Sequence, residues 1–148
     1  MPGPAFKRPV SVLVVVHTAD EVLLMERTHP VGFWQSVTGS LLQEEHPLDA
    51  ARRELHEETG FSAGDTLVDL QLVQRFQIAA EWSHRFPPCT RENVEHAFSL
   101  ALSEPAAPRL NPDEHLCFEW LPAGDAIDRA SSWTNRAAIA KVFPALDV

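Results

Sequence analysis

The segment GSLLQEEHPLDAARRELHEETGF, residues 39–61, constrains the fold more than any other part of this chain. Pro47 suits the first turn of a helix, and Gly60 suits the residue just past a helix end. Most residues between them are good helix formers. We therefore predict a helix from about Pro47 to Thr59. The loop before it should cross the helix face, and Gly39 would let the backbone approach a phosphate closely. An ordinary strand-to-helix turn is the alternative.

Acidic side chains edge the buried face of this predicted helix. At about 100° per residue, Leu48, Ala51 and Leu55 form an apolar stripe. Glu58 falls roughly 20° from Ala51, and Glu54 lies roughly 40° beyond Glu58. Two carboxylates this close repel each other and lose hydration, so they need a cation to hold them together. Oxygen ligands alone favour Mg²⁺ or Mn²⁺, and the sequence therefore predicts a divalent metal site.

A third glutamate of the helix, Glu57, lies beyond Glu54 and only about 40° from Arg53. Residues four apart on a helix can form an ion pair, so we expect Arg53 to orient the Glu57 carboxylate. On an arbitrary helix, such charges are more often a solvated face laced with arginine pairs. The flanking glycines and Glu45 argue against that alternative here.

The same segment resembles the Nudix box, GX5EX7REUXEEXGU, where U is usually an aliphatic residue. At ordinary residue frequencies, a match in a chain of this length has a chance on the order of 10⁻⁷. Phe61 stands at the last U position and keeps its apolar character. Glu44 stands where many boxes have glycine, and His46 stands where a Ser or Thr cap is preferred, so a different loop geometry is expected there. The matching residues are Gly39, Glu45, Arg53, Glu54, Leu55, Glu57, Glu58 and Gly60.

The resemblance to Nudix hydrolases implies a reaction and a set of roles. Such enzymes hydrolyse a nucleoside diphosphate linked to another group, with Mg²⁺ held by glutamates of the box. Glu54 and Glu58 would be metal ligands, and Glu57 a further ligand or the base that activates water. Glu58, Glu57 and Arg53 form the expected catalytic group. The family's glutamate in the loop before the last strand corresponds to Glu114, a third metal ligand or base, although an exposed loop acid is the alternative.

Three further segments carry a narrower resemblance. Lys7–Val15, Phe33–Ser40 and Ser132–Arg136 are similar to the bacterial dihydroneopterin triphosphate pyrophosphohydrolases, and the likeness runs from about Lys7 to Phe143. Members of that group convert 7,8-dihydroneopterin triphosphate to the monophosphate and pyrophosphate in folate synthesis, and some act on dATP. The resemblance therefore implies a small-molecule triphosphate as the partner of this chain.

Substrate contacts follow from the same resemblance. Lys7 and Arg27 suit phosphate, although surface cations are often merely solvated. Trp34 and Phe76 could stack on a pterin or purine, although an aromatic near a strand end more often packs in the core. His84, His96 and His115 are left out of the predicted site because a lone histidine is more often structural. The implied contacts are Lys7, Arg27, Thr38, Phe76, Gln77, Ile78, Ala79 and Ser132.

Composition agrees with a small enzyme. At 148 residues and 45% hydrophobic content, the chain suits a single domain spanning residues 1–148, as a monomer or homodimer. A formal net charge of −9 argues against nucleic acid or an anionic membrane as partner. An acidic protein that handles a polyphosphate needs bridging metal ions, which supports the predicted metal site.

The expected location is the cytoplasm. Cys89 and Cys117 are too few and too far apart for a zinc site or a disulfide framework, and neither has a catalytic setting. The N-terminal stretch MPGPAFKRPV lacks the apolar core of a signal peptide, and no run reaches the length of a membrane span.

Apolar runs and breakers predict an α/β fold. Helices on both sides of a mixed sheet, an α/β/α sandwich, are also the fold of the Nudix hydrolases. The Glu21–Met25 strand should pair with Val10–Val16 after a turn. A final helix should begin at Ser131 or Ser132 and bury Trp133, Ala137, Ala140 and Val142 or Phe143. The predicted strands are Val10–Val16, Glu21–Met25, Phe33–Thr38, Leu67–Ile78, Val94–Leu102 and Cys117–Leu121.

Three functions remain open at this point. The first is the pterin triphosphate hydrolase, the second a hydrolase of deoxynucleoside triphosphates or their oxidised forms. The third is a Nudix-fold module that binds a ligand without turnover. Such modules usually lose glutamates of the box, whereas this chain has all of them.

Overall fold

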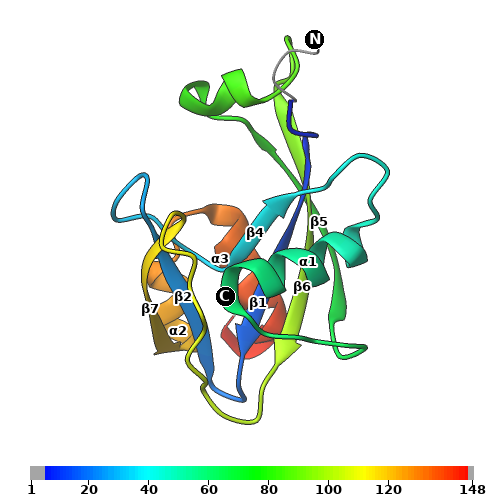
Figure 1. Cartoon of the computed structure of the whole chain (residues 1–148). Coiled ribbons are helices and arrows are strands. Elements are labelled where there is room, and N and C mark those ends of the chain that lie inside the picture. The colour runs from blue at the N-terminus through cyan, green and yellow to red at the C-terminus, as the bar shows by residue number, and fades with distance from the viewer. Residues whose placement is uncertain (1–5, 147–148) are drawn as a thin grey trace.

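The computed structural model describes residues 6–146. Residues 1–5, where the predicted absence of a signal peptide partly falls, and residues 147–148 lie outside the described residues. A central sheet is covered on one face by helix α1 (Pro47–Thr59) and on the other by α2 (Ala123–Arg129) and α3 (Trp133–Val142) (Figure 1). This is the α/β/α sandwich expected from the sequence. No helix within residues 6–146 is long and apolar enough to span a membrane.

Seven strands of the described chain form one sheet. They are β1 (Val10–His17), β2 (Glu21–Arg27), β3 (Trp34–Gln35), β4 (Val37–Ser40), β5 (Val68–Gln77), β6 (Glu92–Ala101) and β7 (His115–Pro122). Strand β1 is central, parallel to β6 and antiparallel to β4, and β5 extends the sheet beyond β6. Because β1 has parallel and antiparallel neighbours, the sheet is mixed, as predicted.

The predicted pairing of the first two strands is wrong along most of their length. Strands β1 and β2 are in register only at His17 and Val22, beside the turn. Beyond it β2 pairs with β7 and β3, while β1 pairs with β4 and β6. A short turn predicts adjacency, but it does not keep two strands paired when each has a longer partner elsewhere.

The segment predicted as one strand, Phe33–Thr38, is broken at Ser36. The Ser36 backbone N–H donates to Asn135 Oδ1 at 2.7 Å, and Asn135 Nδ2 donates to Ser36 Oγ at 3.0 Å. Asn135 lies on α3 and is completely buried. Its amide therefore replaces the ladder bond at Ser36 and ties α3 to the break between β3 and β4.

Helix α1 has the predicted bounds and the predicted end. Gly60 adopts a left-handed φ of 78°, and its N–H donates to the His56 carbonyl. At the other end His46 makes no side-chain cap bond. The apolar stripe differs in one position, since Leu48 is exposed and Ala50 joins Ala51 and Leu55 in the core.

The last helix begins as predicted but buries a different face. The Ser132 hydroxyl accepts from the Asn135 N–H, which caps α3. Trp133 is 52% exposed, whereas Ala138 and Ile139 are fully buried. Three helical segments were not predicted, namely α2 and the short 3₁₀ helices η1 (Ala80–Arg85) and η2 (Pro144–Leu146).

Candidate active site

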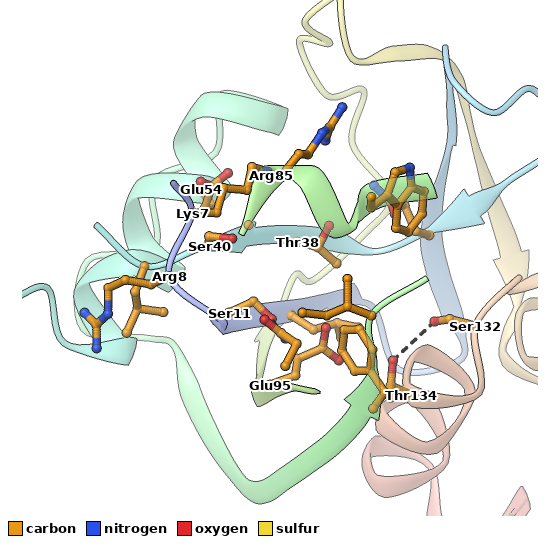
Figure 2. A pocket seen from close by; sticks show the side chains of 18 of the residues that line it. Lys7, Arg8, Ser11, Thr38, Ser40, Glu54, Arg85, Glu95, Ser132 and Thr134 are labelled. Atoms are coloured by element: carbon orange, nitrogen blue, oxygen red, sulfur yellow. Dashed lines mark hydrogen bonds between the residues drawn. The ribbon is translucent and has the colours of Figure 1, made fainter. Parts of the chain in front are cut away.

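A cavity of about 1240 Å³ opens at one end of the sheet, between α1, β4 and η1 on one side and α3 on the other. It is larger than most small-molecule pockets. Figure 2 shows Glu54, Lys7 and Arg85 on one side of strand β4, and Ser11 and Glu95 on the other. The cavity therefore has two chemically different ends.

An acidic cluster occupies the end next to α1. Oxygens of Glu58 and Glu114 and one ring nitrogen of His115 lie within 4.8 Å of one another. Burial raises the pKa of Glu58 well above its usual range, and the adjacent Glu54 carboxyl raises it further. The Thr38 N–H points at Glu58 Oε1 from 3.4 Å. Three carboxyls brought this close fit a divalent cation, which would neutralise their repulsion.

Gly39 is what allows Glu54 into this cluster. A Cβ added at Gly39 would stand 2.1 Å from Glu54 Cδ and 2.3 Å from its Oε1. Only a residue without a side chain leaves that space for the carboxyl. Gly39 thus leaves room for the Glu54 side chain, and the expected approach of its backbone to a phosphate stays a prediction.

Arg53 holds three glutamates at once. It contacts Glu57 at 3.3 Å, as the helix geometry predicted. It also binds Glu54 Oε1 at 2.8 Å and both oxygens of Glu45 at 2.9 and 3.0 Å. The pKa of Glu45 is lowered mainly by this bond, and the Glu45 carboxylate in turn accepts from the Leu42 N–H. Arg53 therefore connects Glu45 of the loop to Glu54 and Glu57 of α1.

Glu44, at a position where many Nudix boxes have glycine, lies in the same loop. Its φ of 63° lies in the left-handed region, which glycine adopts without steric cost. Glu44 thus keeps a backbone conformation that favours glycine at the position where many Nudix boxes have glycine.

His115 belongs to the cluster, although it was not among the predicted site residues. It is 3% exposed, and its Nε2 lies 4.0 Å from Glu58 Oε1 and 3.2 Å from Gln35 Nε2. Its Nδ1 is buried without a hydrogen-bond partner. Burial, and secondarily Arg27, lowers the pKa of His115 to about 4. The ring is therefore neutral at pH 7 and has a lone pair available for a metal.

Lys7 and Arg27 lie near glutamates of the acidic cluster, and Arg85 lies beside both of these cations. Lys7 lies beside Arg85 and Arg27, and its pKa is lowered by burial and then by Arg85. Arg27 is held by the His29 carbonyl at 2.7 Å and lies over the Trp82 ring at 5.4 Å. Like charges so close favour an anion between them, and phosphate has the geometry that guanidinium groups bind. Arg85, contributed by η1, was not predicted.

The structure brings most predicted site residues into one cavity. Every predicted substrate contact lines it, and so do Arg53 and the predicted metal ligands Glu54, Glu58 and Glu114. Glu57 and Trp34 are not among the described residues that line it. The Glu57 side chain is 55% exposed, and the Arg129 guanidinium lies over the Trp34 ring. Trp34 therefore lies outside the cavity in which the stacking role was considered.

A second buried carboxyl lies at the opposite end of the cavity. Glu95 is 5% exposed, and its Oε1 has no hydrogen-bond partner. Burial raises the pKa of Glu95 to about 7, and the Thr134 and Ser11 hydroxyls offset only part of this effect. Glu95 was not among the predicted site residues, because it stands in an otherwise ordinary strand.

Glu95→Gln should stabilise the fold more at pH 8 than at pH 4.5. Because the pKa of Glu95 is about 7 in the folded protein and 4.5 ordinarily, the folded state binds the proton more tightly. Protonated Glu95 therefore stabilises the folded state fully below pH 4.5, and this stabilisation is lost as pH rises to 7. Glutamine does not titrate. The unfolding free energy of Glu95→Gln relative to the parent should therefore increase by about 3 kcal/mol from pH 4.5 to pH 8. Urea unfolding at both pH values measures it.

The exposed Glu92 on the same strand provides the control for this measurement. Glu92→Gln makes the same change at an exposed position of β6, and its unfolding would be measured at the same two pH values. Equal pH dependence of the parent and Glu95→Gln would contradict the raised pKa of Glu95.

The chain is similar to known proteins over nearly its whole length. The NUDIX domain family model matches residues 7–146, and the chain belongs to the Nudix family. It is similar to the dihydroneopterin triphosphate diphosphatase of Escherichia coli, with 40% identity over 94% of this chain and 95% of that protein. The enzyme of the same name from Haemophilus influenzae is 34% identical over 92% of this chain and 88% of its own length.

A solved structure has a similar fold. The fold matches that of the E. coli dihydroneopterin triphosphate pyrophosphohydrolase with a TM-score of 0.86 and 38% identity, over 93% of this chain and 97% of that chain. This chain is therefore a Nudix pyrophosphohydrolase with the mixed α/β fold of the family.

Proposed function

We propose that this protein is a Mg²⁺-dependent pyrophosphohydrolase that converts 7,8-dihydroneopterin triphosphate to the monophosphate and pyrophosphate in folate biosynthesis. The observation that carries the proposal is one cavity with an acidic cluster and three cations at one end and buried polar groups at the other. The first end suits a metal-bound triphosphate, and the second suits a polar heterocycle. The relatives at 40% and 34% identity are named for this activity.

Glu58, Glu114 and His115 would hold the metal ion, with Glu54 next to them. Bound Mg²⁺ would polarise a phosphoryl oxygen, lower the pKa of water and neutralise charge on the leaving pyrophosphate. Mn²⁺ can replace it, because both ions accept oxygen-rich ligand sets.

The chain's own residues orient the substrate. Lys7, Arg27 and Arg85 would bind the phosphate oxygens opposite the acidic cluster, which aligns the pyrophosphate link with it. Arg53 holds Glu54 and Glu57 in place from the side of α1. We assign proton transfer from the attacking water to one of the carboxylates that Arg53 orients, Glu54 or Glu57, or to Glu114 in the loop before β7.

A substrate panel tests the proposal. Pyrophosphate release with Mg²⁺ would be measured from 7,8-dihydroneopterin triphosphate, dATP, dGTP and ADP-ribose, with Glu58→Gln as the blank. We expect the highest kcat/KM for the pterin. A nucleotide preference would leave the Nudix chemistry in place and overturn the pterin assignment. Ligand binding without any release would favour a non-catalytic module.

Lys7→Ala should raise KM by about tenfold while kcat changes little. A charged hydrogen bond to phosphate contributes to binding in the ground state and the transition state alike, and its loss appears mainly in KM. Steady-state kinetics on the preferred substrate measure both constants. Lys141→Ala, which removes an exposed lysine from α3, should change neither. An unchanged KM in Lys7→Ala would remove Lys7 from the site.

A further inference from the structure

We propose that Glu95 reads the ring of the substrate, accepting two hydrogen bonds from the amino-pyrimidinone edge of a 2-amino-4-oxo heterocycle such as a pterin or guanine. This assignment rests on the proposed function, because it uses the same cavity and places the triphosphate at the cationic end. It adds a residue that determines specificity and lies away from the metal cluster.

The position of Glu95 suits this role. Glu95 on β6 is the register partner of Ser11 on β1, and both side chains line the cavity. Figure 2 shows Glu95 beside Ser11, with Thr134 of α3 near them and Glu54 across strand β4. A ring placed at Glu95 would therefore leave its phosphate chain free to extend past Thr38 toward the metal cluster.

The groups around Glu95 already have partners. Asn93 Nδ2 donates to Ser11 Oγ at 2.7 Å, and Gln74 Nε2 donates to the Thr134 carbonyl at 3.0 Å. Glu95 Oε1, in contrast, is buried with no partner. Buried polar atoms almost always have a hydrogen-bond partner, so an unpartnered oxygen in a cavity wall indicates that a ligand supplies it.

The chemistry of a carboxylate selects the ligand. An ionised carboxylate only accepts hydrogen bonds, and its two parallel oxygens match two adjacent N–H donors. A 2-amino-4-oxo ring offers such a pair, its ring N–H and its 2-amino group. Adenine offers a donor beside an acceptor on the corresponding edge, which an ionised carboxylate cannot match. Sites that bind an N–H group reject analogues that lack it more strongly than apolar pockets reject a missing methylene.

Glu95 is costly for the fold, which also indicates a role in binding. Among the described residues, Thr134 and Ser11 are the groups that offset its burial, and both are neutral hydroxyls. A buried carboxylate without a cation destabilises a folded protein. Glu95→Gln should thus gain stability and, at the same time, lose affinity for the ligand.

Binding of unreactive monophosphates tests the assignment. Calorimetric titration with 7,8-dihydroneopterin monophosphate, dGMP and dIMP, which lacks only the 2-amino group of dGMP, avoids turnover. The parent should bind dGMP at least about tenfold more tightly than dIMP. Glu95→Gln should bind the pterin and dGMP at least about tenfold more weakly and lose the preference over dIMP. The control Glu92→Gln should match the parent.

Several outcomes separate this inference from the proposed function. Equal affinities of Glu95→Gln and the parent for the pterin would overturn the inference, even if the parent releases pyrophosphate from the pterin triphosphate. Equal binding of dGMP and dIMP by the parent, or no binding of any of the three, would also overturn it. A Glu95-dependent preference for dGMP without pterin turnover would support the inference and count against the proposed substrate.

Discussion

Glu58→Gln should lower kcat on the order of 10³-fold while the protein stays folded. Glu58 is 2% exposed and belongs to the cluster with Glu114 and His115. Glutamine has nearly the same shape and retains one oxygen that can face the Thr38 N–H, so packing is preserved. It loses the negative charge that a divalent cation needs. Pyrophosphate release with Mg²⁺ measures the effect, and titration with Mn²⁺ measures the accompanying loss of metal affinity.

Thermal unfolding without metal separates a site effect from a folding defect. Because burial and Glu54 disfavour the charged form of Glu58, removing that charge should leave the metal-free variant at least as stable as the parent. Glu104→Gln, in an exposed loop, provides the matched control and should leave kcat unchanged. Near-normal turnover in Glu58→Gln would contradict the assignment of Glu58 to the metal site.

Local sequence signals predicted the elements whose interactions are mostly local. Helix α1 begins at Pro47 and ends before Gly60, as expected, because proline and a left-handed glycine act through their own backbones. The apolar run of β1 predicted a buried strand, because the side chains that require burial are those of the run itself. Pairing partners were harder, since the contacts of β2 with β7 join residues about a hundred positions apart.

Some elements depend on contacts that no local pattern records. The break at Ser36 exists because Asn135, far along the chain, provides its hydrogen bonds. Similarly, α3 buries Thr134 and Asn135, two polar residues whose partners lie on other elements. Hydrophobic periodicity therefore selected the wrong face of that helix.

The residues of the candidate site also divide into those that local sequence patterns predicted and those that they did not. Its glutamates on α1 were found because their spacing on one helix is a local property. His115 and Arg85 were missed because folding alone brings them to the cavity from β7 and η1. Glu95 was missed because a single acidic residue in a strand is usually solvent-exposed, and only the position of β6 between β1 and β5 makes it buried.

Gly39→Ala should lower kcat on the order of 10²-fold with little change in stability. The added Cβ would overlap the Glu54 carboxyl, whose Cδ lies 2.1 Å away. Gly39 lies in β4 without a positive φ, so the backbone tolerates alanine, and the flexible end of Glu54 can move aside. That movement breaks the 2.8 Å contact with Arg53 and displaces the Glu54 carboxyl from the acidic cluster. Misplacement of a catalytic group by about 1 Å is enough for such a loss.

A second glycine provides a control for the same substitution. A Cβ at Gly124 in α2 would meet no atom within 4 Å, so Gly124→Ala should keep full activity and gain up to about 1 kcal/mol from helix propensity. Activity and thermal unfolding would be measured for both variants with Mg²⁺ and without it. Gly39→Ala should also bind Mn²⁺ more weakly, because Glu54 can no longer lie beside Glu58. If Gly39→Ala kept both turnover and Mn²⁺ affinity, the position of Glu54 against Gly39 would not matter for catalysis, and Glu54 would have to leave the metal site.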